Sequence, residues 1–523
     1  MREANTLDRA VIRSRSGGPY LRGCALALLA LFLITFSRAY LMFSLGLSED
    51  ECYYWEWSRN LAPAFYDQGP GVALAIRSGT LLFGDTVLGV RFPALVLGVG
   101  TLVVAYRLGV MVHGSKRSGL LSMLLVALTP LNYFVSLGMI HDVVMLACWA
   151  LCVYFFVCYL RTERSRHFYL CAIALGLGLL TKHTMILMVP SVFLFLLLQP
   201  RYRFVLESPH FWCSTALVVG ICLPLVYWNL VHDWAGLMAV IHLPSSNPHE
   251  AASYVLLGSY VLVQLLAYNP IALIAMMPSV WRHLARSTSD PAKCFLACSV
   301  AVMAIFFLLL STFRTVQANW PICCYFGGFV LLAGVLADAL RRHRPFLPFA
   351  LIAVSITVVA SVVFPAPVLH LSRILGLAID PSDLPTNQLA AGPQVAEALE
   401  AVRTQYPNAM LSANRYQVAA QMAFYLEGQP RVYCFNINSR PNQYEFWESP
   451  NAYLGRDFIF VDYADHPPAQ PIVNLFESLA LIQSGNVVWR NAVVRSYGFS
   501  LMKNFKGLPA RESSRVSGLP QTR

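Results

Sequence analysis

Residues 47–72 read LSEDECYYWEWSRNLAPAFYDQGPGV, and they directly follow the first long apolar run of the chain. Only 12% of the chain is charged. This stretch nevertheless carries five acidic side chains, which are Glu49, Asp50, Glu51, Glu56 and Asp67. Such a cluster beside a membrane-length segment needs an explanation, and the two explanations are structural and functional.

Part of the stretch has a structural explanation. Ser48 followed by Glu51 is typical of a capping box at the start of a helix, and acids in the first turn suit the helix dipole. The aromatic residues at 53–57 would then form an interfacial belt. Neither feature uses Asp50, whose carboxylate is free to point between loop and membrane. We therefore interpret Asp50 as a catalytic or ion-binding group, with a wholly structural loop as the alternative.

The composition indicates a membrane protein. The chain has 523 residues, and 57% of them are hydrophobic, more than a soluble domain of this size can bury. The net charge is +11, but the basic residues gather in short clusters between apolar runs. That pattern is typical of cytoplasmic membrane loops, so membrane lipids rather than nucleic acid are the expected partners. The thirteen cysteines show no metal-ligand spacing.

About eleven apolar runs approach the length of a membrane span. They lie near 22–44, 87–112, 118–138, 142–160, 167–181, 184–199, 211–229, 253–281, 293–312, 321–340 and 346–369. The amphipathic residues 71–83 are expected to lie along the membrane surface between the first two runs. The predicted fold class is an α-helical polytopic membrane protein of about eleven transmembrane helices with a small C-terminal extracytoplasmic α/β domain.

The basic clusters predict the orientation. They precede the first run and then follow at every second connection, at Arg2, Arg9, Arg13, Arg15, Arg22; Lys116, Arg117; Arg161, Arg164, Arg166; Arg201, Arg203; Arg282, Arg286; and Arg341, Arg342, Arg344. Basic residues favour the cytoplasmic side, so residues 1–21 are expected inside. An odd number of spans then places the C-terminal part outside.

The C-terminal part changes character from about Leu371. Membrane-length runs give way to turns, to alternating segments at 431–435 and 457–461, and to helical patterns at 395–403 and 418–426. This mixture predicts a small α/β domain over residues 371–509 that follows the membrane domain of residues 22–370. The basic end, residues 510–523, is expected to be disordered.

The predicted orientation gathers polar residues on the outer face. The loop at about 45–86 is joined there by His141, Asp142, Lys182 and Arg314. Each has a structural alternative: a helix cap for Asp142, a snorkelling or interface anchor for Lys182 and Arg314, and a turn for Asp67. Together they offer acids to deprotonate a hydroxyl and cations to stabilise a leaving phosphate, which a lipid-linked sugar phosphate requires.

Two other polar stretches on this face are interpreted as structural. Asn319-Trp320-Pro321 is read as the entry to a helix. Residues 229–250 contain His232, Asp233, His242, His249 and Glu250, enough ligands for a metal but without a fixed spacing, and are read as a solvated loop.

The order of motifs along residues 40–450 resembles a known family. The motifs are Ser48-Glu-Asp-Glu-x-Tyr-Tyr54, Tyr66-Asp-Gln-Gly-Pro70, Gly89-Val-Arg91, His141-Asp142, Gly176-Leu-Gly-Leu-Leu-Thr-Lys182, Ala318-Asn-Trp-Pro321, Asn414-Arg-Tyr-Gln417, Phe424-Tyr425 and Asn442-Gln-Tyr-Glu-Phe-Trp447. They are similar to the bacterial branch of the protein O-mannosyltransferase and aminoarabinose (lipid A) transferase group. These proteins are C-type integral-membrane glycosyltransferases.

The resemblance implies a function. It implies inverting transfer of a sugar from a polyprenyl phosphate on the periplasmic face of a bacterial inner membrane, to an envelope glycolipid, glycan or protein. Asp50 matches the acidic catalytic position with Glu51 beside it, and Asp142 matches the second acid, although His141 replaces the usual proline. The Asp67 motif departs from the double-proline form. Some relatives use a divalent metal, for which Asp50 would be the ligand.

Two other classes remain as alternatives. A transporter or flippase of lipid-linked sugars would also have many spans with acids and cations within them. The sequence shows no internal repeat and no matched broken spans, which disfavours a secondary transporter. A scaffold protein would not require acids and cations on one face only.

Overall fold

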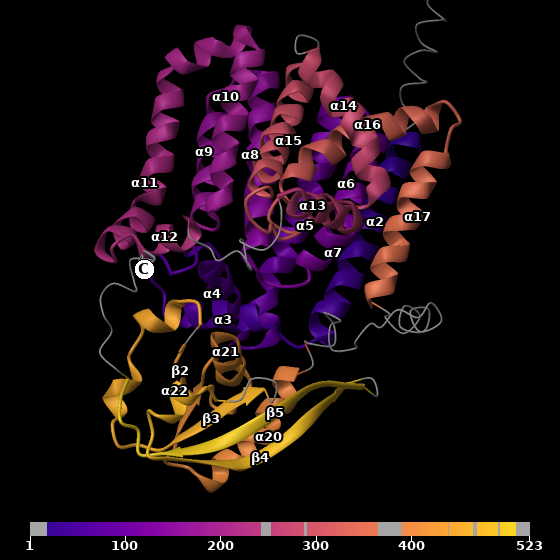
Figure 1. Ribbon diagram of the computed structural model, residues 1–523. Coiled ribbons are helices and arrows are strands. Elements are labelled where there is room, and N and C mark those ends of the chain that lie inside the picture. Colours follow the sequence, from indigo (N-terminus) through magenta and orange to yellow (C-terminus); the bar gives the residue numbers. More distant parts are fainter. Residues whose placement is uncertain are drawn as a thin grey trace, which may run out of the picture.

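The computed structural model describes residues 18–241, 253–286, 290–363, 389, 391–437, 439–463, 468–489 and 492–508. A bundle of helices stands on a smaller domain of strands and helices (Figure 1). Several expectations lie outside the described residues. These are the basic cluster at Arg2–Arg15, the ligands His242, His249 and Glu250, most of the segment 364–390, and the end 510–523.

The helical part covers residues 18–363. Its elements are α2 (Gly18–Ser44), α3 (Glu49–Arg59), α4 (Gly71–Phe83), α5 (Val87–His113), α6 (Lys116–Leu128), α7 (Pro130–Val135), α8 (His141–Thr162), α9 (Arg166–Leu179), η1 (His183–Leu187), α10 (Met188–Leu198), η2 (Pro200–Glu207), α11 (Pro209–Val231), α12 (Ala235–Ile241), α13 (Ser253–Tyr268), α14 (Pro270–Ala285), α15 (Pro291–Leu310), α16 (Cys324–Arg341) and α17 (Phe346–Val363). The amphipathic segment 71–83 coincides with α4.

The protein is a multi-pass membrane protein. Six described helices are long and apolar enough to cross a membrane, and the bent pair α13–α14 makes up to seven. The remaining predicted spans also coincide with helices, but these are shorter, so the total of about eleven stays a prediction. The predicted span 118–138 is two helices, because Pro130 starts α7 directly after α6 ends.

The predicted span 253–281 is also interrupted. Helices α13 and α14 meet at an angle of 102°. Asn269 adopts a φ of +72° at the break, and its side-chain oxygen accepts hydrogen bonds from the backbone N–H of Ile271 and Ala272. Its amide nitrogen donates to the Leu351 carbonyl at 3.0 Å. The bend is therefore capped and held against α17.

The C-terminal domain is built on a five-stranded mixed sheet with the strand order β2-β1-β3-β5-β4. Its strands are β1 (Met410–Ala413), β2 (Val432–Cys434), β3 (Phe458–Tyr463), β4 (Ser478–Trp489) and β5 (Ala492–Lys503). Strand β1 is parallel to β2 and β3, and β5 is antiparallel to β3 and β4. Its helices are α20 (Ala391–Gln405), α21 (Tyr416–Tyr425) and α22 (Gln470–Val473), with the short turns η4 (Gln443–Phe446) and η5 (Pro450–Tyr453). Helices α20 and α21 and strands β2 and β3 coincide with the segments expected from the sequence, whereas β1, β4 and β5 were not named in advance.

The sheet has apolar side chains on both faces. Along β3, Phe458 and Phe460 belong to an aromatic cluster on one face, whereas Ile459 and Val461 pack into the core that continues into the membrane domain. Successive residues of a strand point to opposite faces, so one short strand serves both cores. The core that contains Ile459 and Val461 reaches the membrane domain through α21, which packs against α3.

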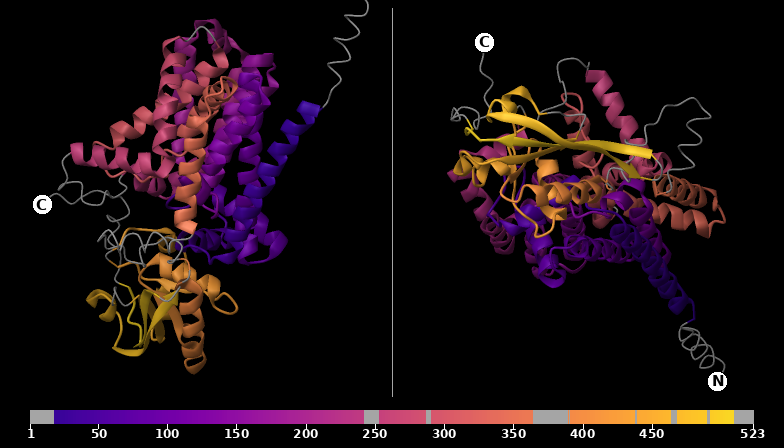
Figure 2. Two further views of the ribbon diagram at one scale, coloured as in Figure 1. Left: turned by 90° about the vertical axis from the view of Figure 1, so that its right-hand side faces the viewer. Right: turned by 90° about the horizontal axis from the view of Figure 1, so that it is seen from below.

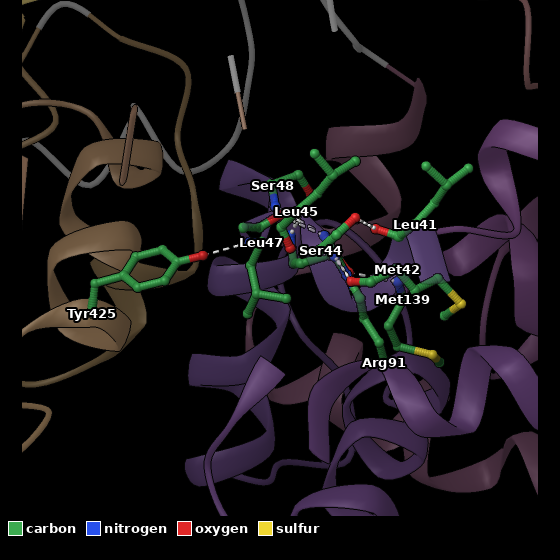
Figure 3. Close-up of polar contacts among 11 residues, drawn as sticks. Leu41, Met42, Ser44, Leu45, Leu47, Ser48, Arg91, Met139 and Tyr425 are labelled. Atoms are coloured by element: carbon green, nitrogen blue, oxygen red, sulfur yellow. Dashed lines mark hydrogen bonds and ion pairs between the residues drawn. The ribbon is translucent and has the colours of Figure 1, made fainter. Parts of the chain in front are cut away.

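The C-terminal domain lies against the end of the bundle at which α2 finishes and α3 and α4 begin (Figures 1 and 2). Arg495 of β5 forms an ion pair with Glu49 at 3.0 Å. The Tyr425 hydroxyl of α21 accepts a hydrogen bond from the backbone N–H of Leu47 (Figure 3). The start of α3 is therefore held by both domains.

The orientation of α3 is fixed by a buried ion pair between Glu51 and Arg91 of α5. Arg91 donates through Nε and Nη2 to the two carboxylate oxygens, at 2.7 and 2.6 Å. Arg91 also donates to the carbonyls of Met42, Leu45 and Gly46, where α2 ends (Figure 3). Glu51 is 1% exposed, so the pair is shielded from water.

Glu51 makes two further bonds that involve the backbone. Glu51 and Ser48 form the predicted capping box, with both reciprocal hydrogen bonds present. The backbone N–H of Met139, which precedes α8, donates to Glu51 at 2.9 Å. Burial alone would raise the pKa of Glu51, but the Arg91 guanidinium and these backbone donors hold that pKa below its usual value. One ionised carboxylate therefore joins α2, α3, α5 and the chain before α8.

We predict that Glu51→Gln destabilises the protein. Removing one partner of a buried ion pair leaves an uncompensated charge on Arg91, at a cost of about 3 kcal/mol or more. Thermal unfolding of the purified protein in detergent should shift to lower temperature. The control is Glu448→Gln, which removes an exposed pair with Arg431 worth at most about 1 kcal/mol. Equal unfolding temperatures for both variants would contradict this role of Glu51.

We also predict that the N-terminus is cytoplasmic and the C-terminal domain extracytoplasmic. The reason is the alternation of basic clusters, to which the positive-inside rule applies. Topology reporters fused after Arg342 and after Gly455 should report opposite sides, and a control fusion after Arg117 should agree with Arg342. A cytoplasmic signal at Gly455 would contradict the span count.

Candidate active site

A cavity of about 510 Å³ lies where the helical bundle meets the C-terminal domain. Six of the seven predicted site residues line it, namely Asp50, Asp67, His141, Asp142, Lys182 and Arg314. They come from α3, the α3–α4 connection, α8, the α9–η1 turn and the segment after α15. The structure thus brings together acids and cations that are up to 264 residues apart, from Asp50 to Arg314.

Glu51 is the exception, because it does not line the cavity. Adjacent residues of an α-helix point about 100° apart, so the same helix directs Asp50 to the cavity and Glu51 to Arg91. The expectation that Glu51 shares the site beside Asp50 is therefore corrected. Its carboxylate positions α3 and has no direct access to the cavity.

Asp50 has the properties of an available base. Its side chain is accessible to water within the cavity, and no described residue forms a hydrogen bond or an ion pair with its carboxylate. Surrounding protein and the negative charge of Glu49 raise the pKa of Asp50 to about 6, although Arg440 opposes the shift. At neutral pH the group is mostly ionised and close to the pKa that suits a general base.

Asp142 and Lys182 form a buried ion pair on the adjacent wall. The Lys182 ammonium lies 2.6 Å from one oxygen of Asp142, and the Asn319 amide donates to the other at 2.9 Å. Helix α8 is preceded by Ile140 at the cap position, so Asp142 is not the helix cap. Lys182 is only 9% exposed and reaches an acid rather than the membrane interface, which rules out the snorkelling alternative.

Asn319-Trp320-Pro321 lies in the turns that lead into α16, but it is more than a helix entry. Helix α16 begins at Cys324, and Asn319 lies in the turns before it, where it contacts Asp142 and lines the cavity. Asparagine and proline are both common in turns, so these residues did not indicate the contact with Asp142.

The wall formed by the C-terminal domain was not expected. Tyr416 and Arg440 both line the cavity. Arg440 forms an ion pair with Asp67, whose other oxygen accepts a hydrogen bond from the Tyr53 hydroxyl at 3.0 Å. Asp67 is thus part of a polar network, in addition to lying in a turn. Arg440 lies two residues before the Asn442–Trp447 motif. This motif was the feature of the sequence that could have pointed to Arg440.

Another part of the cavity lining is mostly apolar, with Arg314 and Gln317 as its polar members. It contains Val240 and Ile241 of α12 and Phe306 and Phe307 of α15. The Arg314 guanidinium donates to the Ile241 carbonyl at 3.3 Å. Residues 229–250 are therefore more than a solvated loop, because their described part contains α12 and contributes to the cavity.

His141 contributes an aromatic surface to the cavity. Its ring packs edge-on against Tyr54, with 4.4 Å between the ring centroids. Neither this contact nor the nearby Trp57 ring makes His141 a base for the reaction.

The side chains in the described part of the chain do not form a metal site. No three histidine, cysteine, aspartate or glutamate side chains gather closely enough there to hold an ion. Asp50 alone does not supply the several oxygen ligands that a divalent cation prefers. The described donor set therefore does not fit the metal that some relatives use.

Comparisons with known proteins agree with the sequence motifs. Residues 67–228 match the family model described as dolichyl-phosphate-mannose-protein mannosyltransferase. A curated relative from Rhizobium johnstonii, the lipid A galacturonosyltransferase RgtD, is 26% identical over 299 residues, or 55% of this chain. The matched region spans 60% of that relative's length.

The fold is similar to that of ArnT from Cupriavidus metallidurans. The crystal structure of ArnT bound to undecaprenyl phosphate aligns with a TM-score of 0.59 and 13% identity, over 92% of this chain and 98% of ArnT. The structure of ArnT in the apo state aligns with a TM-score of 0.61 and 13% identity, over 91% and 98% of the two chains. The family model and the curated relative agree with the resemblance to the C-type integral-membrane glycosyltransferases, and the two ArnT structures share the fold of this chain.

Proposed function

We propose that this protein transfers a sugar from a polyprenyl phosphate to a hydroxyl group of an envelope glycolipid, glycan or protein, with inversion at the anomeric carbon. We place the reaction at the periplasmic face of a bacterial inner membrane. The observation that carries the proposal is one cavity lined by the cations Lys182 and Arg314 and by Asp50, whose carboxylate has no hydrogen bond or ion pair among the described residues. The names of the relatives support the same reaction class, since one transfers galacturonic acid to lipid A and one was crystallised with undecaprenyl phosphate.

Asp50 is the general base in this proposal. It accepts the proton of the acceptor hydroxyl as that oxygen attacks the anomeric carbon. The carbon–oxygen bond to the phosphate breaks on the opposite side of the sugar, and its electron pair leaves with the polyprenyl phosphate. One bond forms as the other breaks, so the configuration inverts. The raised pKa of Asp50 makes it a stronger base than an ordinary surface aspartate.

The cations stabilise the leaving phosphate. Arg314 lies at the apolar wall, where Val240, Phe306 and Phe307 offer a surface for a polyprenyl chain. The Lys182 ammonium is held in place by Asp142 and, through it, by Asn319, so it needs no reorganisation when the phosphate gains charge. No described residue set provides a metal site, and every step of this mechanism uses side chains of the protein.

A transporter or flippase of lipid-linked sugars is the alternative. The broken pair α13–α14 is the feature that a transporter would share. However, the break is filled by Asn269 bonded to α17, and no residue of α13 or α14 lines the cavity. Within the described part of the chain, therefore, the break does not contribute to this cavity.

We predict that Asp50→Asn abolishes transfer and leaves the fold intact. Loss of a general base typically lowers the rate by about a hundred- to ten-thousandfold. No described partner depends on the Asp50 charge, so the free energy of unfolding should change by less than about 0.5 kcal/mol. Transfer is measured in vesicles that contain the purified protein, polyprenyl-linked sugars and envelope glycolipids extracted from cells that lack it.

The matched control is Glu49→Gln, which neutralises the neighbouring acid outside the cavity. The parent should lose activity about tenfold per pH unit below pH 6, because the base becomes protonated. Glu49→Gln should stay active, and its loss of activity should begin at a lower pH than in the parent, because removal of the Glu49 charge lowers the pKa of Asp50. Retention of more than about a tenth of parental transfer by Asp50→Asn would refute its role as base.

We predict that Arg314→Gln raises the KM for the polyprenyl-linked donor about tenfold, the value of one hydrogen bond to a charged group. Lys182→Met should lower kcat as well, because it leaves Asp142 without its cation. Initial rates at varied donor concentration provide both constants. The control Arg341→Gln alters an exposed pair with Asp338 and should leave both unchanged. If both site variants have the same KM and kcat as the parent, Arg314 and Lys182 do not bind the donor phosphate and have structural roles only.

A further inference from the structure

The cavity has two ends of different chemistry. Arg314 belongs to the mostly apolar part of the lining, where it donates to the Ile241 carbonyl and which also contains Phe306 and Phe307. Arg440 lies at the end formed by the C-terminal domain, with Tyr416 and Asp67. A polyprenyl phosphate placed with its chain against the apolar wall brings its phosphate to Arg314. Arg440 then faces the part of the site that holds the sugar or the acceptor.

Hydrogen bonds of nearby residues hold the backbone at Arg440 in place. Asn436 adopts a left-handed φ of +51°, and its amide donates to the Arg440 carbonyl at 2.9 Å and to Glu445 at 2.6 Å. Gln443, three residues after Arg440, forms hydrogen bonds across the boundary to the membrane domain. Its backbone N–H donates to the Tyr53 hydroxyl at 2.7 Å, and its side-chain oxygen accepts from the Tyr66 N–H at 2.8 Å.

These bonds distinguish Arg440 from an ordinary surface arginine. The ordering of a long side chain costs conformational entropy. The bonds of Asn436 and Gln443 are already in place before a ligand arrives. The electrostatic influence of Arg440 reaches Asp50, since Arg440 opposes the rise in the pKa of that carboxyl. Arg440 therefore acts within the reaction cavity although it belongs to the other domain.

The ion pair with Asp67 does not close the site to another anion. The Arg440 side chain is 39% exposed, and a pair with such access to water contributes little stability. The pair uses Nη2 of the guanidinium, which has donors along two further edges. The other oxygen of Asp67 remains held by Tyr53. A carboxylate or phosphate can therefore bind Arg440 beside Asp67 or in its place.

We propose that Arg440 recognises an anionic group of a substrate, a carboxylate or a phosphate, that is distinct from the phosphate linking donor sugar and lipid. The C-terminal domain thereby selects an anionic substrate for the membrane-domain site. This inference rests on the proposed transfer reaction. The anionic group has two sources, a carboxylate on the donor sugar or a phosphate or carboxylate on the acceptor.

The test compares the parent with Arg440→Gln in the vesicle assay. Donor extract is used as isolated or after chemical reduction of its carboxylates, and acceptor glycolipid is used as isolated, after phosphatase treatment or after carboxylate reduction. For the parent, removing the anionic group that Arg440 binds should raise the KM of the treated substrate about tenfold or more. Whether the donor or the acceptor is affected shows which of them carries this group. Arg440→Gln should show this higher KM with untreated substrate and should be insensitive to the same neutralisation, with kcat within about threefold.

Three further variants distinguish recognition of an anionic substrate by Arg440 from a purely structural contact between the two domains. Asp67→Asn removes the partner of Arg440 and should keep the preference for the anionic substrate. Arg440→Lys keeps the charge but loses the planar fork, so it should give an intermediate KM. Arg431→Gln alters another arginine of the same domain, paired with Glu448 on the surface, and should match the parent.

Two results would overturn the inference. One is an Arg440→Gln variant that responds to every neutralisation as the parent does. The other is an equal loss of kcat and thermal stability in Arg440→Gln and Asp67→Asn with no change in substrate preference, as expected for a clasp between domains. If the parent shows no transfer at all, the proposed function itself is overturned. If the parent is active and Arg440→Gln has the same kinetics, only the inference about Arg440 fails.

Discussion

The arrangement of the site depends on the buried ion pair between Glu51 and Arg91. Arg91 binds the carboxylate and also the carbonyls that end α2, so α2, α3 and α5 meet at one guanidinium. Such a pair contributes little net stability, because desolvation offsets much of its attraction, but separating its partners is costly, so it holds these helices together. With Glu51 fixed, the rotation of the helix places Asp50 toward the cavity. The proposed base Asp50 is thus positioned through its neighbour Glu51.

The C-terminal domain is a second constraint on the same helix. The Tyr425 hydroxyl binds the Leu47 N–H at the start of α3, and the Tyr53 hydroxyl binds the Gln443 N–H and Asp67. These contacts close the cavity with residues from both domains. A membrane domain alone would leave Asp50 facing open water, where its pKa would lie closer to the value of a free aspartate.

Features with a local cause could be predicted from the sequence. The apolar runs, the amphipathic α4 and the capping box at Ser48 each depend on neighbouring residues, and their spacing is visible in the chain. The freedom of Asp50 followed from the same local argument. The contacts of Asn319 and Arg440 could not be predicted, because Asn319 is 177 residues from Asp142 and Arg440 belongs to another domain. Such pairings depend on packing across the whole fold, and turn-like sequences conceal them.

The central claim is that this cavity holds the donor phosphate between the cations and within reach of Asp50. A structure of the full chain determined by cryo-electron microscopy with undecaprenyl phosphate tests it most directly. The account predicts phosphate density beside Arg314 and Lys182, the lipid chain along Phe306 and Phe307, and room for a sugar between the phosphate and Asp50. A phosphate bound outside the cavity, or one separated from Asp50 by the Asp142–Lys182 wall, would contradict it.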